Sequence, residues 1–299
     1  MGSRRHAVAS LILPVFLLLP LFRVEGTRAA DGTEGALWVR HAQSRLLSTP
    51  FDVAVDRKGV VFLLESGARV LSIFSPRGEF LREISGRGNW ADPSAVAIGP
   101  TGTVFLADGE SGRVLEMDLS GKVRREYKVG GNARLTGVAV YGDAVFCVDN
   151  RNHRIAVFRK HGASPEFWGK RGEAPGQFQS PFRIVADPTG RLFVTDVLNA
   201  RVQWFSAFGR PLGELKRFGA AEGKIFRPTG ITLDLRGRIW IGDSYTGLVQ
   251  LFEERGRFAK SVRAGGRPLI FGDPVGLAAT AGGVWVADQR ENRLALFRE

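Results

Sequence analysis

The sequence predicts an all-β protein that folds as a six-bladed β-propeller, and three observations support that prediction. The segment PSAVAIGPTGTVFLADGESGRVLEM (93–117) recurs as PFRIVADPTGRLFVTDVLNARVQWF (181–205) and as PTGITLDLRGRIWIGDSYTGLVQLF (228–252). Each copy consists of short β-branched and aromatic runs separated by Gly, Pro, Asn and Asp, which is the pattern of strands and turns. After the first thirty residues, no part of the chain has a long helical period.

Six copies of this unit account for the chain from Pro50 onwards. Weaker copies begin at Pro50, Leu135 and Pro274, and the six starting points are 43, 42, 46, 47 and 46 residues apart. An acidic residue recurs once in every copy, at Glu65, Asp108, Asp149, Asp196, Asp243 and Asp288. Four strands per unit and a period of about 40–45 residues are typical of propeller blades. We therefore expect six four-stranded antiparallel blades.

The two ends of the chain are expected to share one blade. The last copy ends at LALFRE, after its third strand, whereas residues 35–50 have the same punctuation as residues 78–93. Residues 36–41 are therefore predicted to supply the missing fourth strand of the last blade. Such a closed ring leaves no free sheet edge, and the predicted propeller domain spans residues 33–299.

The stretch DNRNHRIAVF (149–158) looks chemically reactive, yet its charged residues recur around the ring. Asp149 and Arg154 have counterparts in three other copies, namely Asp108 with Arg113, Asp196 with Arg201, and Asp288 with Arg293. A pair repeated in this way is predicted to hold each turn through charge-assisted hydrogen bonds rather than to catalyse a reaction. His153, in the same turn, is expected at the surface.

The pattern in DNRNHRIAVF and in DVLNARVQWF (196–205) resembles the NHL repeat, which has an Asp, an Asn three positions on, an Arg five positions on, then an aliphatic and an aromatic residue. The six copies cover nearly all of the chain after the first thirty residues. Three copies depart from the pattern: Glu65 replaces the Asp with Arg69 one position early, Leu248 replaces the Arg, and Met117 replaces the aromatic residue. The resemblance implies a six-bladed propeller and, as in extracellular members, a role as a sensor or scaffold.

The resemblance also implies an alternative function, since some six-bladed relatives are metal-dependent lyases or lactonases. Their zinc is held by histidines, or their calcium by Asn, Asp and Glu, around the central channel. A catalytic zinc needs about three protein ligands at one point, but His41, His153 and His161 fall on an outer strand and on two different turns. We expect no metal, no cofactor and no catalytic residue, and keep a metal-dependent hydrolase or lyase acting at the channel as the alternative.

Residues 1–29 are predicted to be a secretory signal peptide, with cleavage near 26–29. Arg4 and Arg5 precede an apolar run from Ala7 to Phe22, and small residues follow it. The run is shorter than the roughly 20 apolar residues of a membrane-spanning helix, and an uncleaved anchor is the alternative. The mature protein is therefore expected to be a periplasmic or secreted monomer without a transmembrane span.

The net charge of +12 falls to +10 without the first 26 residues, and the loops expected between blades carry much of it. We predict that these loops form a basic, ligand-binding face made of Arg87, Arg134, Lys170, Arg171, Lys216, Arg217, Lys224, Arg227 and Arg267. Arg45 and Arg263 lie in the same loops. Aromatic residues are interleaved with them, and each either touches a ligand or packs between blades: Trp90, Phe178, Phe218, Phe226 and Phe271.

Six residues are expected at the mouth of the central channel, one just before the first strand of each blade. Four of them are small, as a crowded axis demands: Ala95, Gly137, Gly230 and Gly276. The other two, Asp52 and Arg183, are three blades apart and so lie on opposite sides of the mouth. They form either a plug in which the two charges satisfy each other or the polar end of a binding site, and both are candidate ligand-binding residues.

The sequence therefore predicts a non-catalytic binding, scaffold or sensor propeller of the cell envelope. Its expected partner is an anionic envelope component, such as an acidic glycan or a lipid head group, or else a protein. The predicted export disfavours nucleic acid as the partner. Cys147, the only cysteine, is expected to be a buried small apolar residue.

Overall fold

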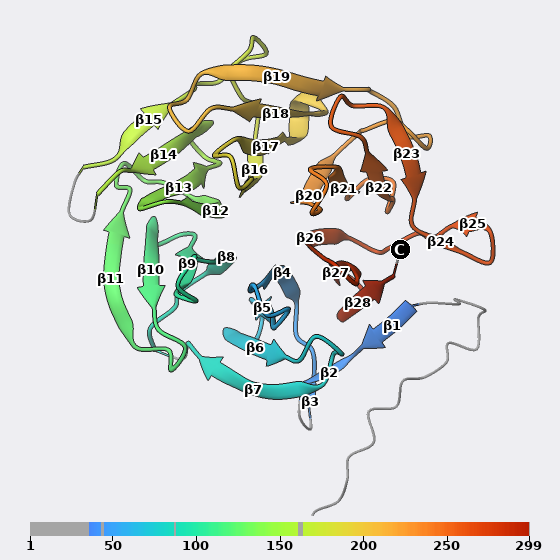
Figure 1. Ribbon diagram of the computed structural model, residues 1–299. Helices are drawn as coiled ribbons and strands as arrows, with labels where there is room; N and C mark the ends of the chain where they lie inside the picture. The colour runs from blue at the N-terminus through green and yellow to red at the C-terminus, as the bar shows by residue number, and fades with distance from the viewer. Residues whose placement is uncertain (1–35, 43–44, 87, 161–163, 299) are drawn as a thin grey trace, which may run out of the picture.

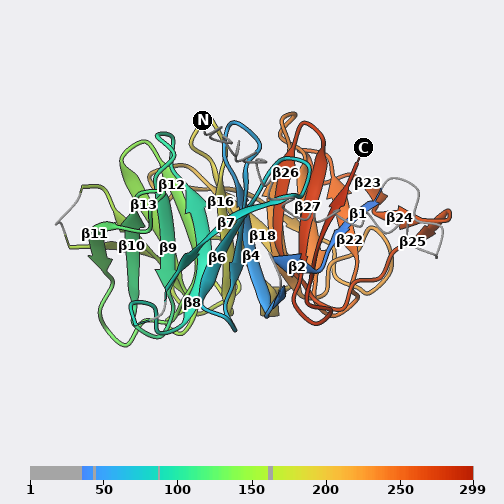
Figure 2. The same cartoon turned by 90° about the horizontal axis from the view of Figure 1, so that it is seen from below.

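The computed structural model describes residues 36–298 apart from 43, 44, 87 and 161–163. These residues form a ring of six four-stranded antiparallel sheets, with inner strands around a central channel and outer strands on the circumference (Figures 1 and 2). The predicted signal peptide, Arg87 and His161 lie outside the described residues. The described part contains a short 3-10 helix, η1 (Val197–Asn199), and holds no helix that is long and apolar enough to span a membrane.

The first three blades follow one another along the chain, each running from the channel outwards. Blade 1 consists of β4 (Pro50–Val55), β5 (Val61–Glu65), β6 (Val70–Phe74) and β7 (Phe80–Ser85). Blade 2 consists of β8 (Pro93–Ile98), β9 (Val104–Asp108), β10 (Arg113–Met117) and β11 (Val123–Lys128). Blade 3 consists of β12 (Leu135–Tyr141), β13 (Ala144–Asp149), β14 (Arg154–Phe158) and β15 (Glu166–Trp168).

The last three blades complete the ring. Blade 4 consists of β16 (Pro181–Ala186), β17 (Leu192–Asp196), β18 (Arg201–Phe205) and β19 (Pro211–Lys216). Blade 5 consists of β20 (Pro228–Leu233), β21 (Ile239–Asp243), β22 (Val249–Phe252) and β23 (Phe258–Ser261). Blade 6 consists of β26 (Pro274–Thr280), β27 (Gly283–Asp288), β28 (Arg293–Phe297) and β1 (Ala36–Val39). Two hairpins lie outside the blades: β2 (His41–Ala42) with β3 (Arg45–Leu46), and β24 (Arg263–Ala264) with β25 (Arg267–Pro268).

The predicted repeat agrees with the strands. The six starting points are the first residues of the inner strands, and the six recurring acids are the last residues of the second strands. Closure is also confirmed, because β1 pairs antiparallel with β28, with Trp38 opposite Ala295. Figure 1 shows β1 beside β28, so that the N-terminal strand completes the blade that the C-terminus begins.

The hydrophobic core lies between neighbouring blades. The second strands are buried along their whole length, apart from the partly buried Ala144 at the start of β13, because one face of the sheet packs on the preceding blade and the other on the next. Between blades 3 and 4, for example, Phe146 and Val148 pack with Ile184 and Val194. Burial on both faces explains why these strands read as continuous apolar runs rather than as alternating ones.

The four predicted Asp–Arg pairs form, and each aspartate also holds the chain that enters its blade. Nitrogen–oxygen distances are 2.9 Å for Asp149 with Arg154 and for Asp196 with Arg201. In addition, the backbone N–H of Gln179, in the loop that enters blade 4, donates to Asp196 at 2.7 Å. The pair therefore fastens the incoming loop to the turn, which is the structural role that the repetition predicts.

The two blades that lack an Asp–Arg pair are stabilised differently. In blade 1, Glu65 binds Arg45 at 2.7 Å, so the arginine comes from the N-terminal segment and not from the turn that holds Arg69. In blade 5, where Leu248 replaces the arginine, Asp243 accepts four backbone N–H groups, from Phe226, Arg227, Tyr245 and Thr246, at 2.6 to 3.0 Å.

Candidate functional site

Close backbone approach explains the small residues at the channel mouth. A Cβ on Gly276 would lie 2.7 Å from the Cα of Asp52, and one on Gly137 would lie 2.9 Å from the carbonyl oxygen of Phe182. The inner strands also shift register at this level, between Pro50 and Asp52 in blade 1 and across Arg183 in blade 4. Such β-bulges re-aim a side chain, and here they direct the two charged residues towards the axis.

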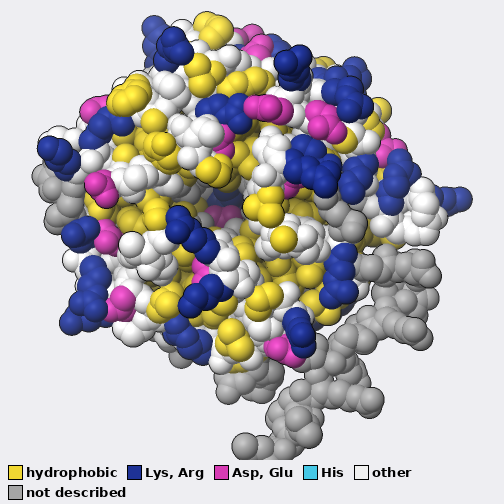
Figure 3. Space-filling view, viewed as in Figure 1, with side chains coloured by type: hydrophobic (Ala, Val, Ile, Leu, Met, Phe, Trp, Pro, Cys, Tyr) yellow, Lys and Arg dark blue, Asp and Glu magenta, His cyan; other side chains and the backbone are white. Residues whose placement is uncertain are grey.

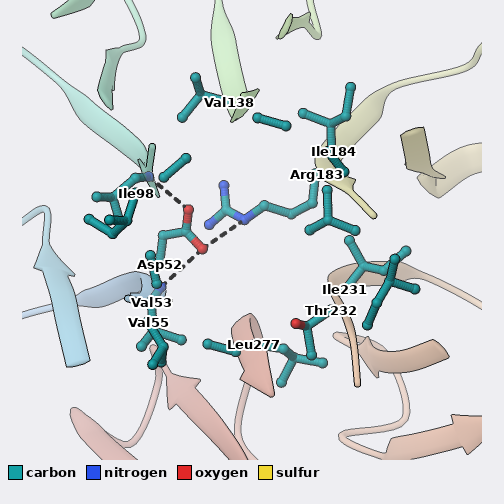
Figure 4. Close-up of a pocket in the computed structure, with 18 of the residues that line it drawn as sticks. Asp52, Val53, Val55, Ile98, Val138, Arg183, Ile184, Ile231, Thr232 and Leu277 are labelled. Carbon is teal, nitrogen blue, oxygen red and sulfur yellow. Dashed lines mark hydrogen bonds and ion pairs between the residues drawn. The ribbon is translucent and has the colours of Figure 1, made fainter. Parts of the chain in front are cut away.

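Arg183 crosses the channel from blade 4 to the opposite side (Figure 4). Its guanidinium donates hydrogen bonds to backbone carbonyls of four other blades: Phe51 in blade 1, Ser94 in blade 2, Thr136 in blade 3 and Val275 in blade 6. The rings of Phe51 and Phe182 flank it, with centroids 5.0 and 4.8 Å from the guanidinium carbon. Arg183 thus connects five of the six blades at the axis.

Asp52 meets Arg183 at the centre of the ring. Its Oδ1 lies 3.5 Å from Nε of Arg183, and the backbone N–H groups of Val53 and Val96 donate to the carboxylate at 3.0 and 2.9 Å. Burial raises the pKa of Asp52, although Arg183 and the two N–H groups oppose that shift. Burial likewise lowers the pKa of Arg183. These contacts match the plug alternative, whereas ligand binding by the two residues stays a prediction.

The plug forms the floor of a cavity of about 230 Å³ that occupies the channel. The inner strands run away from this floor, so the cavity opens on the face that carries the turns between first and second strands. Figure 3 shows this hollow at the centre of the ring, with basic and acidic side chains deep inside it. Its wall is aliphatic apart from Thr232 and consists of residues such as Val55, Ile98 and Leu233.

Ion pairs occupy three of the arginines in the loops between blades. Arg45 binds Glu65 and Glu83, at 2.7 and 3.1 Å, so it serves the fold. Arg134 lies 3.3 Å from Glu110, and Arg263 lies 2.8 Å from Glu222. Figure 3 also shows Lys and Arg spread over the opposite face of the ring. Basic residues are therefore not confined to the loops between blades.

Two neighbouring loops between blades, called crossings below, keep exposed basic residues that form no ion pair within the described part of the chain. They are the crossings into blades 4 and 5, and the residues are Lys170, Arg171, Lys216, Arg217, Lys224 and Arg227. Arg217 donates to the carbonyl of Gly256 in the turn between β22 and β23, so its guanidinium contacts the outer part of blade 5. Arg267 is exposed in the β24–β25 hairpin.

The interleaved aromatic residues divide into two groups. Trp90, Phe178 and Phe271 are at most 3% exposed and pack between blades. Phe218 is 66% exposed and Phe226 is half-buried. Tyr245, which is 60% exposed in the turn after Asp243, is a third member of this second group that was not predicted from the sequence. The feature of the sequence that could have identified it is an aromatic residue in the turn of blade 5, where Leu248 replaces the arginine.

A second cleft, of about 720 Å³, lies between blades 2 and 3 and was also missed. Glu116 lies in it and is 9% exposed, although the same position of the other blades holds Ile73, Val157, Trp204, Leu251 and Leu296. Tyr127 donates to Glu116 at 2.8 Å, and Arg125 lies 3.4 Å from it. Burial, followed by the hydrogen bond to Glu116, raises the pKa of Tyr127 to about 12.

The described histidines lie apart from one another. His41 is exposed on β2, whereas His153 lies in the turn between β13 and β14, where its Nδ1 accepts a hydrogen bond from the backbone N–H of Ser180 at 3.1 Å. Among the residues that the structure describes, no group of three or more His, Cys, Asp or Glu is placed to hold a metal ion. Cys147 is fully buried as predicted, and burial raises the pKa of its thiol.

Comparison with known proteins supports the fold. No protein-family model matches the chain. Streptogramin B lyase is 13% identical over 89% of this chain and 98% of that one, with a TM-score of 0.66. Virginiamycin B lyase from Staphylococcus aureus is 14% identical over 88% of this chain and 99% of that one, with a TM-score of 0.65. The Cps50 (Swd1) propeller domain of Myceliophteria thermophila is 10% identical over 88% of this chain and 99% of that one, with a TM-score of 0.61.

At these identities the likeness concerns the fold alone, because one propeller scaffold carries many unrelated functions. These similar structures include two lyases and the Cps50 (Swd1) propeller domain. The chain is a six-bladed β-propeller, and its resemblance to the NHL repeat rests on the sequence pattern of its blades.

Proposed function

We propose that the protein is an exported, non-catalytic binding module that holds a polyanionic partner at the crossings into blades 4 and 5. The observation that carries the proposal is the set of six exposed basic residues there, called the basic patch below, which form no ion pair among the described residues: Lys170, Arg171, Lys216, Arg217, Lys224 and Arg227. By contrast, the channel charges Asp52 and Arg183 neutralise each other.

Unpaired cations on neighbouring loops raise the local concentration of an anionic partner. Each charge is exposed, so its effect is screened once the distance to the ligand exceeds about 10 Å at 0.1 M salt. Binding to the patch should therefore weaken steeply as salt rises. Because exposed charges contribute little to stability, they can be exchanged without unfolding the ring.

The test reverses three patch residues and compares them with a matched control. The patch variant is Arg171→Glu, Lys224→Glu and Arg227→Glu, and the control is Arg57→Glu, Lys58→Glu and Arg236→Glu in turns on the opposite face. All six residues are exposed, and both variants change the net charge equally because each replaces three basic residues by glutamate. We expect the patch variant to lose at least tenfold in affinity for inorganic polyphosphate at low salt, and the control to lose less than threefold. Equal losses would mean that net charge alone drives binding, and the proposal would fail.

The second candidate function is catalysis in the channel, which one observation favours. The channel cavity ends at Asp52, a buried carboxyl group whose pKa is raised by burial, and perturbed groups in cavities mark candidate active sites. A metal-dependent hydrolase or lyase would need a bound ion. One equivalent of zinc or calcium in the purified mature protein, measured by elemental analysis, would favour this candidate over the binding module.

A further inference from the structure

We infer that three aromatic rings beside the basic patch, two of them exposed and one half-buried, form a stacking site for the sugar rings of an acidic polysaccharide, and this inference rests on the proposed function. The rings belong to Phe218, Phe226 and Tyr245, called the aromatic strip below. The Phe218 and Phe226 centroids are 5.2 Å apart, and the Phe226 and Tyr245 rings stack with centroids 4.2 Å apart.

The core of the ring does not require these aromatic residues. Phe178, which fills the gap between blades 3 and 4, corresponds in the next crossing to Ile225, which is fully buried. Phe226 is the following residue and is therefore additional to the packing position. The residues of blade 4 that correspond to Phe218, Phe226 and Tyr245 are Arg171, Gln179 and Leu198, none of which is aromatic.

The strip lies where the repeat is broken, and Asp243 holds it in place. With Leu248 instead of arginine, the carboxylate of Asp243 accepts the N–H groups of Phe226 and of Tyr245, at 2.6 and 3.0 Å. One buried side chain thus fixes both segments that carry the stacked rings. A preorganised strip loses little conformational freedom when it binds a ligand.

Basic residues are neighbours of the strip in the sequence. Arg217 precedes Phe218 in the chain, and Arg227 follows Phe226, while Lys224 lies two residues before it. Phe218 is 66% exposed and Tyr245 is 60% exposed, and both rings contact Phe226, so the three form a contiguous aromatic surface rather than an isolated apolar residue. Aromatic faces next to cations fit a ligand that alternates flat ring surfaces with negative charges. A linear polymer of uronic acid has this chemistry, and the predicted export favours it over nucleic acid.

The experiment separates the rings from the charges. The strip variant is Phe218→Ser with Tyr245→Ser, which leaves every charge in place, and its control is Phe208→Ser with Leu235→Ser, at residues that are 82% and 83% exposed in turns on the opposite face. Each protein is titrated at low salt with polygalacturonate fragments and with inorganic polyphosphate, which has charges but no rings. Single-stranded poly(dT) and vesicles containing phosphatidylglycerol are the other probes.

We expect the strip variant to lose about tenfold in affinity for polygalacturonate and to keep its affinity for polyphosphate within twofold. The control should retain both affinities. An unchanged affinity of the strip variant for polygalacturonate would overturn the inference while leaving the basic patch intact. If the wild-type protein instead binds poly(dT) or the vesicles at least tenfold more tightly than polygalacturonate, and loses that binding in the strip variant, the strip serves a different ligand and the inference is wrong. Failure of the charge-reversal test would reject the proposed function itself.

Discussion

Asp196 and Arg201 show how burial sets the value of a repeated ion pair. Arg201 is 2% exposed at its side chain, whereas the equivalent Arg154 is 24% exposed. Arg201 also binds Glu214 at 2.7 Å and the carbonyl of Gln177 at 2.9 Å. Removing the Asp196 carboxylate takes away the buried counter-charge of this guanidinium and leaves only Glu214, whose side chain is 40% exposed, whereas Arg154 can turn towards water.

We therefore expect Asp196→Ala to lower the free energy of unfolding by about 3 kcal/mol and Asp149→Ala to lower it by about 1 kcal/mol. Urea titration followed by circular dichroism measures both values. Equal costs for the two variants would show that the aspartates act through the backbone N–H groups that they accept, and not through their arginines.

At the scale of elements, the N-terminal segment fastens the ring twice. Its strand β1 pairs with β28 in blade 6, and Arg45, a few residues later, binds Glu65 in blade 1. The same segment thereby joins the first and last blades of the chain. Without β1, the outer edge of β28 would present unpaired backbone groups, which favour association with other chains.

Deletion of residues 36–39 should abolish the single cooperative unfolding transition or cause aggregation. Differential scanning calorimetry and light scattering detect these two outcomes. The control removes residues 264–267 from the β24–β25 hairpin, which pairs with none of the blades. A β1 deletion that melts like the control would mean that the ring does not depend on this strand for closure.

At the scale of the whole molecule, one arginine at the axis joins five blades, and the buried carboxylate of Asp52 is its ion-pair partner. Burial raises the pKa of Asp52 above its ordinary value of 3.8 despite the presence of Arg183. A carboxyl whose pKa is raised in the folded state stabilises the fold fully below its unfolded pKa, and that contribution is lost as the pH rises through the folded pKa. The charge of Asp52 thus costs stability at neutral pH.

Asp52→Asn should consequently gain stability relative to the wild-type protein as the pH rises from about 4 to about 7, because asparagine stays neutral throughout. Urea unfolding at several pH values in this range measures the difference. If the variant loses stability relative to the wild type as the pH rises, the attraction of Arg183 outweighs the cost of burying the carboxylate.

The sequence alone determined the architecture, because its signals are local and repeated. The spacing of Pro50, Pro93 and their counterparts located every inner strand, and the pattern before residue 50 identified the closing strand. The recurrence of Asp149 with Arg154 identified an ion pair of the fold. Each of these features depends on residues close in sequence or on equivalent positions in successive copies.

Only the tertiary structure decided which charges and rings are available for binding. Arg183 reaches carbonyls up to 132 residues away, Arg134 is paired with an acid from the preceding turn, and Tyr245 stacks on Phe226 from a different loop. These contacts depend on how blades approach one another and on which loops face each other across a crossing. The period of the repeat does not predict the distances between side chains on different blades, because these distances follow from the packing of the whole ring.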